Sequence, residues 1–326
     1  MTRTIKIGKW TYGGDFPALY LAPMAGLSDL PFRRICLQCK CDVVVSEMTD
    51  ARPDLLATER TKRQIAFGDE NAPKIVQLAG GNAYLMAEAA RLMQDLGADA
   101  LDINMGCPAK RVGKQSAGSA LLANPKLAVE IMNAVVRAVK IPVFLKTRIG
   151  FDEENINISD IAKAAEAAGI QAIAVHGRTR KQRFTGQARY EEIAAVRDVI
   201  SIPVIVNGDI NSVKKAFFLS KEYNFDGLMI GRAAIGNPWL FSEIKAEFSG
   251  KKNTLTAQEK RQMVKEHIGA IHNFYTEKFG VPIARTHLHA YFAKDSNYLT
   301  VRDKINTADS ADMQLAIIDE YLFKSG

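Results

Sequence analysis

The feature that most limits the fold is a set of eight short runs rich in Val, Ile and Leu, which recur about every 25 to 40 residues. Helical stretches separate them, as is typical of repeated βα units around a parallel sheet. Turn sequences such as GADAL at 97–101 stand where a helix ends and the next strand begins. The eight predicted strands lie within 19–24, 42–48, 74–80, 100–106, 142–148, 172–178, 203–209 and 227–233.

Eight such units in about 240 residues match the size of a closed (β/α)8 barrel, whereas an open doubly wound sheet usually has fewer strands. The Gly-x-Gly-x-x-Gly fingerprint of such open sheets is absent after the first run. Asn124-Pro125 predicts a helix that runs to about Val139, and Ser159 predicts another that ends near Gly169. The predicted fold class is therefore α/β, a (β/α)8 TIM barrel.

The strand pattern stops near residue 240, and a helical pattern follows it. Thr256-x-x-Glu259 has the form of a capping box. Apolar residues then recur on one helical face over 263–275 and again over 283–292. We therefore expect a catalytic barrel domain at 1–240 and a C-terminal helical-bundle domain at 241–326.

The cysteines and the apolar runs indicate where such a chain works. Four cysteines are too few for a disulfide framework, which favours reduced thiols and a cytoplasmic protein. Cys36, Cys39 and Cys41 are spaced like a metal clip but lack a fourth ligand, so we interpret them as structural. The N-terminus does not resemble a signal peptide, and the apolar runs are shorter than the roughly 20 residues that span a bilayer.

Barrel enzymes carry their working residues at the C-terminal ends of the strands, where side chains from different strands converge. The predicted strand ends are rich in polar residues, although the strand interiors are apolar. Buried polar groups need partners, so this concentration indicates a binding site better than it indicates core packing. The residues are Glu47, Gln77, Asn104, Cys107, Lys146, Arg148, His176, Asn207, Asp209 and Arg232.

Several of these features together describe a site for FMN. The last two strands end in 207–209 and 231–232, where glycines let backbone N–H groups approach a phosphate, unless they merely form tight turns. Lys146 lies among apolar residues and needs a partner, either an electron-rich ring or Glu47 in a buried ion pair. The Gln77 amide could bind the pyrimidine side of the flavin.

Cys107 follows the fourth predicted strand in the long loop 104–120. Its thiol could be a nucleophile, a metal ligand, an acid or inert. Neither a spaced metal ligand nor a nearby base accompanies it in the sequence, although His176 could be its partner in space. The residues alone leave these alternatives open.

The net charge of +7 is concentrated in three loops expected at the C-terminal ends of the strands. Such clustering indicates an RNA backbone as partner, and an ordinary solvated surface is the alternative. The basic residues are Arg178, Arg180, Lys181, Arg183 and Arg189 after the sixth strand, Lys110, Arg111 and Lys114 after the fourth, and Arg52, Arg60, Lys62 and Arg63 after the second.

Long motifs in a fixed order resemble the tRNA-dihydrouridine synthases, particularly those of the bacterial B-type. The similarity spans the barrel and continues into the helical domain at IARTHLHAYF (283–292). The barrel motifs are LAPMAGLSDLPFR (21–33), VSEM (45–48), VQLAG (76–80), DINMGCPAKRV (102–112), LKTRIGF (145–151), VHGRTRKQRFTG (175–186), VNGDI (206–210) and MIGRAAIGNPW (229–239).

The resemblance implies a role for many of these positions. Cys107 resembles the general acid of the family, Asn104 and Arg178 resemble residues that hold the target uridine, and Lys110 and Arg180 resemble tRNA contacts. Asn237 departs from the family, which often has a basic residue before this Pro-Trp pair. The FMN contacts implied by the resemblance are Pro23, Met24, Ala25, Gln77, Lys146, His176, Asn207, Gly208, Asp209, Gly231 and Arg232.

The implied reaction is the FMN-dependent reduction of uridine to 5,6-dihydrouridine in the D-loop of tRNA, with NADPH as reductant. Hydride would pass from flavin N5 to C6 of a flipped uracil, and Cys107 would protonate C5. An ordinary thiol is protonated at neutral pH, as an acid requires. The B-type resemblance favours U17 as the target.

Two other functions fit the barrel. One is an FMN-dependent reductase of free pyrimidines, of the dihydroorotate type, which needs neither the basic loops nor a helical domain. The other is an RNA-binding barrel without turnover. For the tRNA-modifying enzyme we expect a monomer that binds neither a membrane nor a metal.

Overall fold

The computed structural model describes residues 2–113, 116–251, 255–293 and 298–322, except for the side chains at 110 and 111. The chain divides into two compact units. The first comprises 1–30 with 41–231, and the second comprises 31–40 with 232–326. The segment after the first barrel strand therefore groups with the C-terminal helices, although it lies far from them in the sequence.

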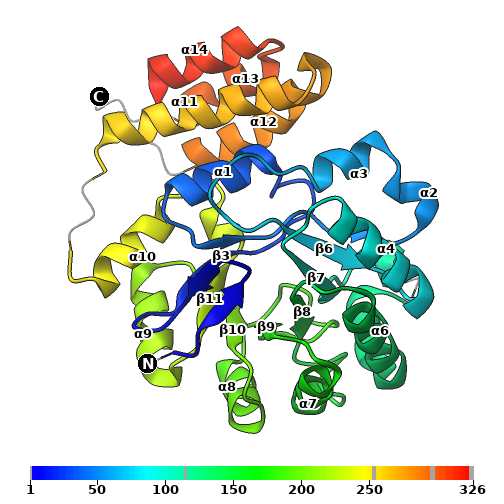
Figure 1. Cartoon of the computed structure of the whole chain (residues 1–326). Helices are drawn as coiled ribbons and strands as arrows, with labels where there is room; N and C mark the ends of the chain where they lie inside the picture. The colour runs from blue at the N-terminus through cyan, green and yellow to red at the C-terminus, as the bar shows by residue number, and fades with distance from the viewer. Residues whose placement is uncertain (1, 114–115, 252–254, 294–297, 323–326) are drawn as a thin grey trace. The chain divides into compact units, whose positions relative to one another are not determined.

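The first unit is built on parallel strands that neighbour one another in chain order (Figure 1). The last strand, β11, returns to pair with the first, β3, so the order forms a cycle. Each strand except β5 overlaps a predicted run. The strands are β3 (Ala18–Leu21), β4 (Val43–Val44), β5 (Thr49–Asp50), β6 (Ile75–Ala79), β7 (Ala100–Met105), β8 (Val143–Arg148), β9 (Ala172–His176), β10 (Val204–Asn207) and β11 (Gly227–Ile230).

The second predicted strand, 42–48, contains only the short strand β4, and β5 follows just beyond it at Thr49–Asp50. β4 pairs with β3 on one side, and β5 pairs with β6 on the other. Between them Val45 pairs with Ile75, so the same segment touches both neighbours and closes the sheet. The prediction of a (β/α)8 barrel is confirmed.

The barrel interior is filled at two levels. Inward positions alternate with period two along a strand, so β6 presents Ile75 and then Gln77, and β8 presents Phe144 and then Lys146. Ile75 and Phe144 belong to an apolar cluster, and the residues that follow them are polar. The N-terminal hairpin, β1 (Ile5–Ile7) with β2 (Trp10–Tyr12), adds Ile5 and Ile7 to this cluster.

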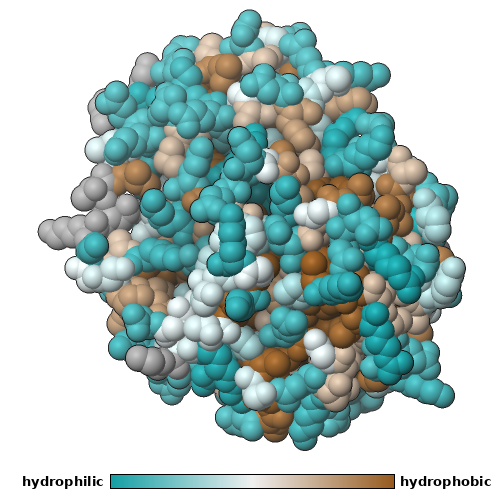
Figure 2. Space-filling model, in the orientation of Figure 1, coloured by the Kyte–Doolittle hydropathy of each residue, from teal (hydrophilic) through white to brown (hydrophobic). Residues whose placement is uncertain are grey.

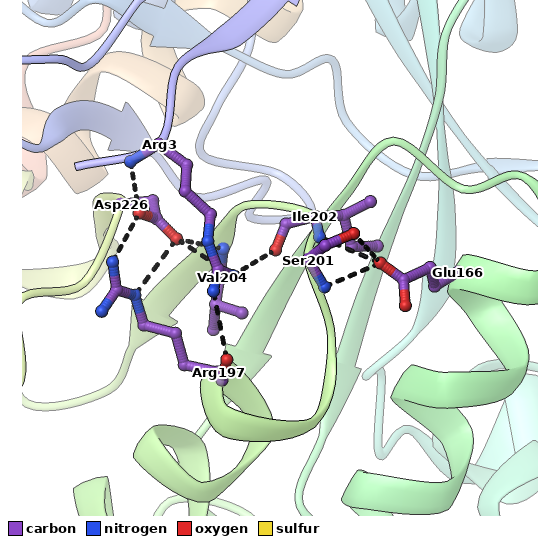
Figure 3. A network of polar contacts seen from close by, with 7 residues as sticks. All are labelled: Arg3, Glu166, Arg197, Ser201, Ile202, Val204 and Asp226. Carbon is purple, nitrogen blue, oxygen red and sulfur yellow. Dashed lines mark hydrogen bonds and ion pairs between the residues drawn. The ribbon is translucent and has the colours of Figure 1, made fainter.

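Two carboxylates hold loops at the N-terminal ends of the strands (Figure 3). Buried Asp226 accepts hydrogen bonds from the backbone N–H groups of Arg3 at 2.7 Å and Val204 at 2.9 Å. It also pairs with the guanidinium of Arg197 at 3.2 Å. Glu166 holds the loop before β10 in a similar way. A buried carboxylate such as Asp226 is costly without partners, so its contacts stabilise this end of the barrel.

The crossover helices lie outside the strands (Figure 1). As predicted, Asn124 caps α6, and Gly169 ends α7 with a φ of 95°. However, α7 begins at Ile158, one residue before the predicted Ser159. The helices are α2 (Pro53–Leu56), α3 (Glu59–Gln64), α4 (Ala83–Asp95), α5 (Lys110–Gly113), α6 (Pro125–Ala138), α7 (Ile158–Ala168), α8 (Tyr190–Val199) and α9 (Val213–Tyr223), with a 3-10 helix η1 (Gly118–Ala123).

The second unit is helical, as predicted. Thr256 and Glu259 form the expected capping box at the start of α11. The predicted faces of α11 and α12 bury Ile268 and Leu288 among their apolar residues. Its elements are α1 (Leu30–Gln38), the 3-10 helix η2 (Arg232–Ala234), α10 (Leu240–Phe248), α11 (Ala257–Phe274), α12 (Glu277–Phe292), α13 (Tyr298–Thr307) and α14 (Ala311–Tyr321).

Hydrophilic residues make up most of the surface in view, and hydrophobic residues occupy separate areas among them (Figure 2). Exposed apolar side chains include Tyr84 and Leu96 on or next to α4. Within the described part of the chain, no helix combines the length and the apolar character needed to cross a membrane.

Candidate active site

The polar level of the barrel interior brings five predicted site residues to the C-terminal ends of neighbouring strands. Each residue is at most 9% exposed. The parallel register sets Asn104 beside Lys146, and Asn207 beside His176. The five residues are Gln77, Asn104, Lys146, His176 and Asn207.

Gln77 and Asn104 belong to one chain of hydrogen bonds that begins at Asp102. Gln77 Nε2 donates to Asp102 Oδ2 at 2.6 Å, and Asn104 Nδ2 donates to Gln77 Oε1 at 2.7 Å. Burial raises the pKa of Asp102, whereas the hydrogen bond from Gln77 and the charge of Lys146 act to lower it. A buried carboxylate therefore lies directly beneath the predicted site.

The backbone of Cys107 is held on both sides. Its N–H donates to Asn104 Oδ1 at 3.0 Å, and its carbonyl oxygen accepts from the hydroxyl of Ser119 at 2.8 Å. Gly118 has a φ of 62°, and a Cβ atom there would lie 2.8 Å from the Cys107 oxygen, so this close approach requires glycine. Cys107 is partly exposed, so its backbone is held while the residue stays accessible.

Lys146 donates from Nζ to Asn207 Oδ1 at 3.1 Å, and Asn207 Nδ2 donates to the Met229 carbonyl at 2.8 Å. Burial is the main cause that lowers the pKa of Lys146, and the Arg148 charge adds to it. Glu47 instead accepts a hydrogen bond from the backbone N–H of Gly26. The alternative of a Lys146–Glu47 ion pair is therefore wrong.

Arg178 lies inside the protein at 2% exposure. Its Nη2 donates to Asp209 Oδ2 at 2.7 Å and to the Gly186 carbonyl at 2.6 Å, and its Nε donates to the Thr185 carbonyl. Its Nη1 lies 3.3 Å from His176 Nε2. Because a guanidinium only donates, this His176 nitrogen must be the acceptor.

The turn after β3 contains the predicted contacts 23–25. The N–H of Met24 donates to Ser28 Oγ at 2.7 Å. Gly26 follows with a φ of 75° and is held by Glu47. These contacts define the conformation of the turn at the C-terminal end of β3.

The predicted phosphate residues follow β10 and β11. Gly208 and Asp209 both have positive φ, and a Cβ atom on Gly208 would lie 2.8 Å from Ala188 Cβ. Gly231 has more room, because a Cβ atom there would lie 3.5 Å from Met24 Sδ. Arg232 is exposed at the start of η2 and belongs to the second unit.

Arg180 lies next to the end of α5. Its guanidinium stands 5.0 Å from the centre of the Phe151 ring, and a Cβ atom on Gly113 would lie 2.7 Å from its Nη2. Helix α5 also contains Lys110, whose side chain lies outside the described residues. The two predicted tRNA contacts therefore come from neighbouring segments.

The basic loop 178–189 has no acid in its own sequence, but the structure supplies two. Lys181 pairs with Asp152 at 2.8 Å, and Arg189 pairs with Glu153 at 2.8 Å. Since Arg178 is also internal, less positive charge is open to an RNA than the sequence suggests.

Arg148 has a connecting role that the sequence did not assign. It is 1% exposed, donates from Nε to the Gly106 carbonyl at 2.7 Å, and donates from Nη1 to the Thr179 and Arg183 carbonyls. It thereby ties the loop that carries Cys107 to the basic loop. The signal in the sequence was its period-two spacing from Lys146.

The remaining cysteines are buried free thiols at Cys36, Cys39 and Cys41. In the parts of the chain that the structure describes, no three His, Cys, Asp or Glu side chains gather in a way that could hold a metal ion.

Comparison with known proteins covers nearly the whole chain. The family model "Dihydrouridine synthase (Dus)" matches residues 20–325. The chain is 44% identical to tRNA-dihydrouridine synthase B of Vibrio parahaemolyticus over 97% of this chain and 98% of that protein. It is 43% identical to the protein of the same name from Pseudomonas aeruginosa, over 97% and 95%.

Solved structures with low identity share the barrel fold. A morphinone reductase variant in complex with tetrahydroNAD has a TM-score of 0.53 and 13% identity, with coverage of 75% of this chain and 90% of that one. Histamine dehydrogenase from Rhizobium has a TM-score of 0.55 and 13% identity over 82% of this chain, which spans 50% of that longer protein.

Proposed function

Because this chain belongs to the dihydrouridine synthase family, we propose that it reduces uridine in tRNA to 5,6-dihydrouridine. The observation that carries the proposal is the placement of Cys107. Its backbone is held at both the N–H and the carbonyl, and the residue is partly exposed beside the buried polar level. A proton donor needs this combination of fixed position and access.

The polar level suits FMN. Lys146 carries three N–H donors, and Asn207 Oδ1 is its acceptor among the described residues, so a buried cation keeps donors for an electron-rich ring. When bound, the flavin supplies the hydride that saturates the uracil, and NADPH is its reductant. The residues that would hold it are Pro23, Met24, Ala25, Gln77, Lys146, His176, Asn207, Gly208, Asp209, Gly231 and Arg232.

The chain itself would hold the uracil and deliver one proton. Cys107 Sγ protonates C5 of the ring. Asn104 keeps a second N–H on Nδ2, and Arg178 Nη1 has a long 3.3 Å contact with His176, so both can donate to uracil carbonyls. Such donors suit uracil, whose carbonyl oxygens are acceptors.

The tRNA backbone would bind at Lys110 and Arg180, with further contacts from the helical domain at 241–326. The target base would leave its stack to reach the barrel, as enzymes that act on bases require. We propose U17 of the D-loop as the target and a cytoplasmic monomer as the working form.

Tests in cells and with the purified protein separate this function from the alternatives. Mass spectrometry of tRNA from a deletion strain should show lost dihydrouridine at one D-loop position. The wild-type gene should restore it, and Cys107→Ala should not. A colourless protein that cannot take up FMN would favour the non-catalytic barrel. Turnover of free pyrimidines with unchanged tRNA would favour the small-molecule reductase.

A further inference from the structure

Asp102 is a buried carboxylate that the proposed reaction does not use. It lies on β7, two residues before Asn104, and is 5% exposed. Its hydrogen bond comes from Nε2 of Gln77 on the neighbouring strand, at 2.6 Å. A buried charge is costly, so its placement against an amide side chain needs a reason.

The reason is that the carboxylate determines the direction of the hydrogen bonds between Gln77, Asn104 and the loop that carries Cys107. An ionised carboxylate only accepts, so Gln77 must turn its NH2 group toward Asp102. Gln77 Oε1 then accepts from Asn104 Nδ2 at 2.7 Å. Asn104 Oδ1 in turn accepts from the backbone N–H groups of Gly106 at 3.1 Å and Cys107 at 3.0 Å.

Both ends of this series of hydrogen bonds determine its direction, because the carboxylate can only accept and the backbone N–H groups can only donate. If the Gln77 amide were flipped, its oxygen would face the Asp102 carboxylate, and its NH2 group would face the NH2 group of Asn104. Reversing Asn104 would set its NH2 group against two backbone donors. Unpaired buried polar groups are costly, so each amide keeps one orientation.

We propose that Asp102 is a positioning residue for Cys107, acting through Gln77 and Asn104 to hold the loop that carries the thiol. The inference rests on the proposed function in one respect, the assignment of Cys107 as proton donor. Asp102 itself does not touch the reacting atoms.

Amide hydrogen exchange in the full-length, flavin-loaded protein directly tests whether Asp102 stabilises the loop that carries Cys107. Asp102→Asn replaces the charged acceptor of Gln77 Nε2 with a neutral amide oxygen, so the hydrogen bond that anchors the path is weakened. Exchange at Gly106 and Cys107 should become about tenfold faster relative to other amides of β7, because a hydrogen bond to a charge becomes a neutral one. Unchanged relative exchange at both amides would overturn the proposal.

Asp226→Asn is the matched control, since it alters a buried carboxylate at the other end of the barrel. It should lower stability and leave the relative exchange at Gly106 and Cys107 unchanged. An equal acceleration in this control would show that any loss of a buried charge loosens the loop, which would also overturn the proposal.

Gln77→Met interrupts the same path at its middle. It should accelerate the same two amides, and adding Asp102→Asn to it should have no further effect, whereas additive effects would contradict the path. If Asp102→Asn does not fold, Gln77→Met alone decides, and unchanged exchange in that variant rejects the proposal.

Kinetics separate positioning from a general structural defect. Asp102→Asn should lower kcat for uridine reduction about tenfold, with the KM for tRNA and the rate of flavin reduction by NADPH unchanged. An equal loss in flavin reduction would reject a specific role toward Cys107. Wild-type protein that forms no dihydrouridine would reject the proposed function, and the exchange experiment would still decide whether Asp102 holds the loop.

Discussion

The two ends of the barrel use buried carboxylates in different ways. At the N-terminal end, Asp226 binds the backbone of Arg3 and Val204 directly, together with the guanidinium of Arg197 (Figure 3). At the C-terminal end, Asp102 binds a side-chain amide, and the hydrogen bonds reach the backbone only after two side chains. The first arrangement ties the fold together, whereas the second orients groups in a site. Substitutions at the two ends should therefore separate stability from activity.

The largest effect is expected for Cys107→Ala. Loss of a general acid typically slows a reaction by about 10²- to 10⁴-fold, so dihydrouridine formation should fall at least about a hundredfold. The unfolding midpoint and NADPH oxidation by the bound flavin should stay near those of the wild type. Single-turnover product analysis and urea unfolding measure the two effects, and normal product formation would reject the assigned role.

Asp226→Asn should give the opposite result. Because it leaves the Arg197 charge without its partner, the free energy of unfolding should fall by roughly 3 kcal/mol. The rate of uridine reduction per folded molecule should not change. Urea unfolding and kcat would be measured on the same preparation, and a loss of kcat at full stability would contradict the division between the two ends.

The helical unit differs from both ends of the barrel, because it buries polar groups that have no hydrogen-bond partner among the described residues. Both ring nitrogens of His287 lack a hydrogen bond among the described residues, and the ring packs 4.7 Å from His267 and 5.2 Å from Phe32. Burial lowers the pKa of His287 to about 4. A depressed pKa means that the unfolded chain binds the proton more readily.

The stability contributed by neutral His287 is therefore present above pH ~6.5 and is lost as the pH falls toward about 4. Over that range the loss should reach roughly 3 kcal/mol. Helical circular dichroism during urea unfolding at several pH values measures it. His287→Phe should flatten the dependence, and an unchanged slope in that variant would assign the acid sensitivity to other groups.

The smallest effect is expected at the tRNA contacts. Arg180→Ala should weaken tRNA binding a few-fold and reduce the salt dependence of the affinity by about one counterion, as for a single phosphate contact. Lys6→Ala, on the exposed side of the N-terminal hairpin, is the control and should bind normally. Titrations at several salt concentrations measure both, and equal behaviour of the two variants would remove Arg180 from the interface.

Most of the fold follows from local patterns. Apolar runs bounded by turns identified every barrel strand except the two-residue β5, and side-chain caps such as Asn124 identified helix starts. The split between β4 and β5 was not predictable, because it depends on which neighbour each piece pairs with. The grouping of α1 with the C-terminal helices likewise depends on contacts distant in sequence. The domain boundary at 240 stays a prediction.

For the site, strand ends and period-two spacing identified the polar residues but not their partners. Lys146 donates to Asn207, 61 positions away, whereas the sequence analysis offered only Glu47 as its partner within the protein. Arg178 counts as a surface charge in the sequence, yet Asp209 and backbone carbonyls enclose it. Which partner each of these side chains binds depends on the geometry of loops that only the folded barrel brings together. The ligand roles of these residues stay predictions.

The central claim is that this barrel reduces one tRNA uridine with Cys107 as its acid. The most direct measurement incubates the purified, FMN-loaded chain with NADPH and an unmodified tRNA transcript, then maps the product by mass spectrometry. The account predicts the gain of two hydrogen atoms at U17, and no gain with Cys107→Ala. Oxidation of NADPH by the loaded wild-type protein without any reduced uridine in the transcript would contradict it.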